Sequence, residues 1–173
     1  MSTPSTVTGE RADILRTLTR HRGFLRFTTN DLTDEQAAAR TTVSELCLGG
    51  LIKHVTEVER QWARFIVEGP AAQPDWQDGA AAQEWMNGFK MLPGETLAGL
   101  LAGYGEVARA TDELVASLPS LDAEQPLPEA PWYEKGAKWS ARMVLLHIIG
   151  ETSQHAGHAD IIREALDGAK TMG

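Results

Sequence analysis

Apolar side chains recur at helical intervals along almost the whole chain, and this spacing constrains the fold more than any other feature. Leucine, isoleucine and valine return every three or four residues within four long segments, residues 9–27, 45–68, 95–118 and 141–167. The segments between them are rich in proline and glycine rather than in alternating β-branched residues, so we expect no sheet. This pattern predicts an all-α protein, a four-helix bundle that forms one domain over residues 1–173.

Cap residues set the expected ends of two of these helices. Ser44 and Ser140 can each accept a first-turn N–H through the hydroxyl group, and we expect both to be N-caps. Gly69, which precedes a proline, and Gly168 are expected to end the same two helices, because glycine readily adopts the conformation of a helix C-terminus.

Two proline-rich stretches separate the last three long helices. Residues 70–93 and 119–139 predict long loops, the first with one helical turn near residues 80–88. A short helical turn is expected earlier in the chain, where Thr33 and Gln36 have the spacing of a capping box. We expect the two long loops to shape any substrate pocket, since loops positioned by a rigid scaffold often carry function.

The chain has a negative charge that excludes some partners. Its 173 residues include 16 lysines and arginines and 24 aspartates and glutamates, which give a formal net charge of −8. No basic cluster offers a positive face, so we expect neither a nucleic acid nor a membrane as partner. A domain of this length can bury an adequate core without a structural metal, so a bound metal would serve chemistry.

Cysteine usage and the N-terminal sequence indicate a compartment. Cys47 is the single cysteine and cannot form an internal disulfide, which fits a reducing environment. The chain shows neither a leader-like segment nor a window of about 18 uninterrupted apolar residues, so we expect a cytoplasmic protein. The side chain of Cys47 is expected to be a small part of the core.

Polar and ionisable side chains interrupt the apolar face of the last predicted helix. His147, Glu151 and His155 are each four residues apart and therefore lie along one line, with His158 a turn beyond His155. This line continues the apolar stripe, so these side chains should face the core of the bundle. Because burying them without partners is unfavourable, a ligand or mutual hydrogen bonds must satisfy them.

The second long helix offers a counterpart in His54, which lies on the buried stripe of that helix. Two imidazoles and one carboxylate, from His54, His155 and Glu151, are the three protein ligands of an open site for Zn²⁺, Ni²⁺, Fe²⁺ or Mn²⁺. The alternative is that these are core histidines held by hydrogen bonds. His147 is expected either to hydrogen-bond Glu151 or to be a core residue.

Other polar and aromatic residues support weaker alternatives. Glu57 lies one turn from His54 and would suggest, with the acidic residue and histidine of the last helix, a di-metal carboxylate bundle, but the first and third long helices supply no ligand. His21, between two arginines, is expected to be solvated. Four aromatic residues are expected either to line the mouth of a pocket or to anchor the core and loops: Trp62, Trp132, Trp139 and Tyr133.

Two stretches of the sequence resemble the DinB-like superfamily. They are residues 51–59, around His54, and residues 139–168, which include the run Glu151-Thr-Ser-Gln-His155-Ala-Gly-His158. The resemblance implies an up-up-down-down four-helix bundle, often a homodimer, with a divalent metal held by three side chains. It implies His54 and His155 as two of these ligands, with Glu151 where many members have histidine. A related enzyme, mycothiol-dependent maleylpyruvate isomerase, looks similar in using a glutamate at that position.

Superfamily members of known activity are enzymes that depend on low-molecular-weight thiols. The resemblance therefore implies a divalent-metal-dependent thiol S-transferase, with mycothiol as the expected thiol, zinc as the expected metal and an electrophilic small molecule as substrate. A bound metal ion would hold the cofactor thiol as a thiolate. His158 is expected to be catalytic, either relaying a proton or binding a polar group of the substrate. The alternative is a non-catalytic stress-response bundle that binds a metal or a ligand through the same residues.

Overall fold

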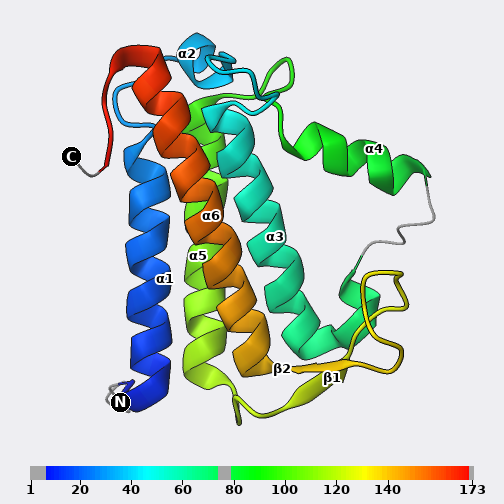
Figure 1. Ribbon diagram of the computed structural model, residues 1–173. Helices are drawn as coiled ribbons and strands as arrows, with labels where there is room; N and C mark the ends of the chain where they lie inside the picture. The colour runs from blue at the N-terminus through cyan, green and yellow to red at the C-terminus, as the bar shows by residue number, and fades with distance from the viewer. Residues whose placement is uncertain (1–6, 74–78, 172–173) are drawn as a thin grey trace.

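Four long helices packed side by side form the body of the computed structural model, which describes residues 7–73 and 79–171 (Figure 1). They are α1 (Gly9–Phe27), α3 (Leu48–Glu68), α5 (Leu97–Ser117) and α6 (Ala141–Asp167). Shorter elements connect them: α2 (Asp34–Ala38), the 3-10 helix η1 (Gly69–Ala72), α4 (Gly79–Gly88), β1 (Glu124–Pro126) and β2 (Lys138–Ser140). The predicted all-α bundle is confirmed. None of the described helices has an apolar stretch long enough to cross a bilayer.

The long helices run in the order up, down, down, up, as the colours of Figure 1 show. At one end of the bundle Arg142 donates to Glu10, so α1 and α6 start together, and at the other end Arg163 Nη1 donates to the carbonyl of Thr28 at 2.9 Å. The predicted up-up-down-down order is therefore wrong. The cause is the connections: residues 28–47 stay at one end of the bundle, whereas residues 69–73 lie at the opposite end and residues 79–96 lead back to the first, which makes α3 and α5 parallel.

Most of the predicted cap residues act as expected. Ser140 Oγ accepts the N–H of Met143, Gly168 ends α6 in the left-handed conformation with φ 82°, and Thr33 forms the capping box of α2. The prediction of Ser44 as a cap is wrong, because Ser44 Oγ accepts the N–H of Leu46 in a local turn instead. Cys47 is the N-cap of α3, and its sulfur accepts the N–H of Gly50 at 3.4 Å.

Both predicted loops contain more regular structure than the sequence indicated. Residues 70–93 include most of η1 and the ten-residue α4, where one helical turn was expected, and residues 74–78 of that loop lie outside the described part. In the second loop, β1 and β2 pair antiparallel with Gln125 opposite Trp139. The expectation of no sheet is therefore wrong, and strands of three residues are too short to produce a readable alternation.

The bundle core consists of two apolar clusters with a buried polar layer between them. One cluster lies toward the hairpin end, around Phe65 and Ile148, and the other toward α2, around Leu51. Within the polar layer Arg22 of α1 holds both carboxylate oxygens of Glu59 on α3, at 2.5 and 3.2 Å. Both side chains are almost fully buried.

Candidate metal centre

His54 lies in the middle of α3 and is buried, with 3% of its surface exposed. Its ring is held between two aromatic side chains: Phe89, just after α4, stacks on it with 4.0 Å between ring centroids, and Trp85 of α4 meets it edge-on at 4.8 Å. Burial, together with the nearby imidazole of His155, lowers the pKa of His54 to about 4. The imidazole is therefore neutral at pH 7, which is the form that binds a metal ion.

Glu151 and His155 lie one turn apart on α6 and face His54. The His155 Nε2 and Glu151 Oε2 atoms are 3.6 Å apart, and the rings of His54 and His155 meet edge-on with centroids 4.7 Å apart. The neighbouring imidazole of His155 lowers the pKa of Glu151, so its carboxylate is ionised at neutral pH. The structure thus brings the three predicted ligands together on two facing helices.

The geometry of these three residues fits a metal ion. One donor atom from each of His54, Glu151 and His155 lies within 4.8 Å of the other two. Two atoms bound at about 2.1 Å from one ion lie at most about 4.2 Å apart, so small side-chain rotations suffice to close the site. A mixed nitrogen and oxygen set of this kind, with open positions, suits zinc and also harder divalent ions.

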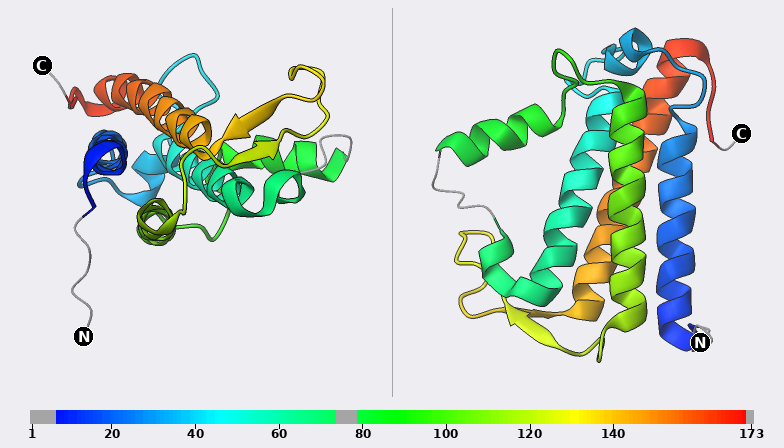
Figure 2. Two further views of the ribbon diagram at one scale, coloured as in Figure 1. Left: turned by 90° about the horizontal axis from the view of Figure 1, so that it is seen from below. Right: turned by 180° about the vertical axis from the view of Figure 1, so that it is seen from behind.

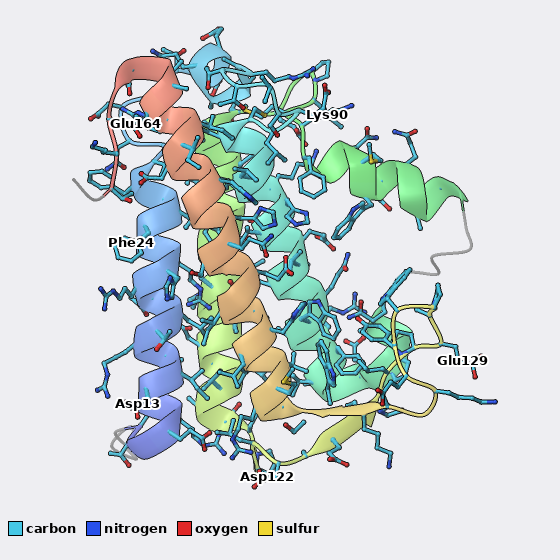
Figure 3. The ribbon with its side chains drawn as sticks, in the orientation of Figure 1. Asp13, Phe24, Lys90, Asp122, Glu129 and Glu164 are labelled. Carbon is cyan, nitrogen blue, oxygen red and sulfur yellow. The ribbon has the colours of Figure 1, made fainter. Side chains whose placement is uncertain are left out.

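All three donor residues line one cavity of about 570 Å³. Its lining residues come from α3, α4, α6 and the connection between β1 and β2, among others. On that side of the bundle α4 and the β1–β2 hairpin extend together beyond α3 (Figure 2). Lys90, just after α4, and Glu129, in the connection between the two strands, lie at the upper and lower ends of that side (Figure 3). Because His54, Glu151 and His155 line this cavity, a small molecule bound in it would have direct access to an ion held by these three residues.

The aromatic walls of the cavity were predicted only in part. Trp62, Trp132 and Tyr133 line it as expected, whereas Trp139 lies behind the wall and stacks on Trp62 with 4.9 Å between centroids. Sequence reasoning missed the side chains that α4 and the residue after it contribute, Trp85, Met86 and Phe89. The four-residue spacing of Trp85 and Phe89 is the signal that could have placed them on one helix face.

A comparison with protein families agrees with this site. The family described as mycothiol-S-transferase has a model that matches residues 13–168, nearly the whole of the bundle. The chain belongs to the mycothiol-S-transferase family. This family is part of the DinB-like superfamily, so the resemblance predicted from the sequence is confirmed. Among curated proteins, none matches the chain.

Two further histidines accompany the donor set of this mycothiol-S-transferase family member. His147 lines the cavity, and its Nε2 lies 3.9 Å from Glu151 Oε1, which is an electrostatic contact and too long for a hydrogen bond. His158 is outside the cavity lining, and its Nδ1 lies 3.4 Å from His155 Nδ1. The structure therefore pairs His158 with a donor residue, and its predicted catalytic role stays a prediction.

The remaining predicted candidates lie away from the donor set. Glu57 accepts a hydrogen bond from Gln61 at 2.9 Å and pairs with Arg60, so its carboxylate is engaged on the surface of α3. Cys47 is buried, as expected for a core residue, but its sulfur caps α3. His21 is half-exposed on α1 with its ring against Phe24.

Proposed function

We propose that this protein is a divalent-metal-dependent thiol S-transferase that uses mycothiol and acts on an electrophilic small molecule. One observation carries the proposal: His54, Glu151 and His155 converge on the wall of a cavity that is large enough for a small ligand. The family to which the chain belongs is described as mycothiol-S-transferase, and this supports the choice of thiol.

The chemistry requires a nucleophile that the chain itself does not provide. Cys47 is buried as the cap of α3, and it is not among the residues that line the cavity. When bound by the three donors, a divalent ion would lower the pKa of the cofactor thiol and so supply a thiolate at neutral pH. In the transfer the thiol gives up its proton to solvent, its sulfur bonds to the electrophilic carbon, and the leaving group departs with the electrons of the broken bond.

The residues of the site have complementary roles in this proposal. His54 binds as a neutral imidazole, while the ionised Glu151 offsets one positive charge of the ion. The Nδ1 atom of His155 faces His158, so this contact can fix which ring nitrogen of His155 binds the metal. The aromatic side chains around the cavity limit the access of water to the thiolate.

Metal content and thiol consumption test the proposal. The purified protein should bind zinc stoichiometrically, and His54→Ala and His155→Ala should lose most of that zinc, whereas His21→Ala on α1 should keep it. The zinc-loaded protein should then accelerate the reaction of mycothiol with monochlorobimane. Equal and negligible metal in all four proteins would refute the metal site. Zinc binding without any thiol consumption would instead support the non-catalytic bundle.

A further inference from the structure

The cavity walls are largely aromatic and carry little charge. Rings from three different parts of the chain face it: Trp62 from α3, Trp85 from α4, and Trp132 and Tyr133 from the hairpin connection. The hairpin side is braced, because Trp139 stacks on Trp62 and meets Tyr133 edge-on at 5.9 Å. Among the described lining residues there is no lysine or arginine. A flat apolar ring suits such walls, since aromatic rings pack face to edge or offset.

An anionic ligand does not suit this cavity. With a divalent ion bound, Glu151 and the thiolate of the cofactor would together carry two negative charges, which would balance the charge of the ion. The described lining residues include no lysine or arginine that could then pair with a carboxylate of the substrate. Moving an unpaired carboxylate from water into an aromatic cavity is strongly unfavourable.

One residue of the cavity lining carries a buried hydrogen-bond donor that has no partner among the described residues. Gln73, just after η1, lines the cavity, and its Nε2 atom is buried and makes no hydrogen bond within residues 7–73 and 79–171. Its backbone is fixed, since its N–H donates to the carbonyl of Pro70 at 3.0 Å. Gln61, the other amide in the lining, differs because its Nε2 already donates to Glu57. A buried donor without a partner is unfavourable, and a ligand acceptor would satisfy it.

We propose that this cavity holds the electrophile and selects an uncharged, planar aromatic one whose hydrogen-bond acceptor pairs with Gln73 Nε2. The proposal rests on the proposed function, because it names the substrate class of the same site. Gln73 is then a specificity-determining residue: it orients the acceptor end of the ring while the reactive carbon faces the donor set. The volume of about 570 Å³ admits a substrate of drug-like size.

A matched set of benzylic chlorides tests the charge and acceptor preferences. Methyl para-(chloromethyl)benzoate has a neutral acceptor, para-(chloromethyl)benzoate a carboxylate, and para-methylbenzyl chloride neither. Each rate with zinc-loaded protein and mycothiol is divided by the rate without protein, which removes intrinsic reactivity. We expect this acceleration to be at least about tenfold greater for the ester than for the carboxylate, because the carboxylate enters without a partner. Equal acceleration of the ester and the carboxylate would overturn the proposal.

Variants of the two amides test the role of Gln73. Gln73→Met keeps the shape of the side chain and removes the donor, so KM for the ester should rise about three- to tenfold while KM for para-methylbenzyl chloride changes little. Gln61→Met is the matched control, and it should leave the ratio of the two KM values unchanged. If Gln73→Met has the melting temperature of the wild type and the same ratio of the two KM values, the assignment of Gln73 is contradicted.

A binding measurement separates this proposal from the proposed function. The unreactive methyl para-toluate should bind the zinc-loaded protein more tightly than para-toluate, as measured by calorimetry, and Gln73→Met should reduce the difference. If this pattern appears but no thiol is consumed, the selectivity of the cavity stands and the transferase proposal fails. If thiol is consumed but the ester and the carboxylate bind and react alike, the transferase proposal stands and the selectivity fails.

Discussion

The carbonyl group of Phe89 lies directly over Gly50 in the first turn of α3, where a methyl group on Gly50 would overlap the Phe89 oxygen. This crossing places the Phe89 ring against His54, four residues further along α3, with 4.0 Å between centroids. The absence of a side chain at Gly50 therefore determines how closely the residues after α4 approach the donor set.

Substitution of Gly50 should disturb both the stability and the metal affinity of the protein. In Gly50→Ala the new methyl group meets backbone atoms of Phe89 and Lys90, which must move, and we expect a loss of about 1–3 kcal/mol in the free energy of unfolding. Zinc affinity should fall with it, because the Phe89 ring no longer packs on His54. Urea denaturation and zinc titration measure the two effects. Gly23→Ala on α1, where an added methyl meets nothing within 4 Å, should instead stabilise the protein by up to about 1 kcal/mol.

Removal of His158 should weaken metal binding without removing a donor. His158 Nδ1 is 3.4 Å from His155 Nδ1, and a partner of this kind orients a ligating imidazole. His158→Phe should therefore lower zinc affinity about 10- to 100-fold, measured by competition with a chelating dye. His158→Gln, which retains an acceptor, should recover part of the loss. His21→Phe is the control on α1, and an affinity in His158→Phe equal to that of this control would exclude the orienting role.

The buried pair of Arg22 and Glu59 should be sensitive to the loss of one partner. Glu59→Gln leaves the buried guanidinium of Arg22 with only the partly exposed Asp112 as its opposite charge, and we expect a cost of up to about 3–5 kcal/mol in the free energy of unfolding. The double variant Arg22→Met with Glu59→Met should lose less free energy of unfolding than the sum of the losses in Arg22→Met alone and Glu59→Met alone. Arg64→Ala breaks an exposed pair with Glu68 on the same helix, and should cost less than about 1 kcal/mol. Additive losses at the buried pair would contradict the coupling.

The stability of the metal-free protein should decrease below pH 6.5. In the folded state burial lowers the pKa of His54 from 6.5 to about 4, so between these values the unfolded chain binds more protons than the folded one. Unfolding is therefore favoured as the pH falls through this range, and the stabilisation by neutral His54 is present above it. Melting temperatures of chelator-treated protein at pH 7, 6 and 5 measure the effect.

The comparison protein for this pH series is His54→Leu. Its melting temperature should change less steeply between pH 7 and pH 5, although some slope remains because burial also lowers the pKa of His147. Identical slopes in the two proteins would show that His54 is not the titrating group.

The helices could be predicted from the sequence because their signals are local. Apolar spacing and the caps Ser140 and Gly168 depend only on neighbouring residues, and both caps are observed. The directions of the helices could not be predicted in the same way, since they depend on whether a connection stays at one end of the bundle or returns along it. The chain between α3 and α5 returns to the end at which α3 began, and no local pattern distinguishes such a connection.

The same distinction applies to the candidate site: local spacing predicts one part of it, and contacts between distant segments determine the rest. The four-residue spacing of Glu151 and His155 makes them neighbours on any α-helix, and the apolar stripe around His54 turns it toward the core, so the structure places the three close together. The contact of Phe89 with His54 depends on a crossing between distant segments. The buried amide of Gln73 depends on tertiary packing in the same way, and neither could be inferred from spacing.

The return path between α3 and α5 has a consequence for how such a protein can diversify. Because those two helices run in the same direction, the chain must travel back along the bundle, and α4 on this path faces the donor set at His54. None of the described side chains of α4 belongs to the two core clusters. Mutations in α4 can therefore accumulate and reshape the pocket while the bundle keeps its stability, so the pocket can change without rebuilding the scaffold that positions His54, Glu151 and His155.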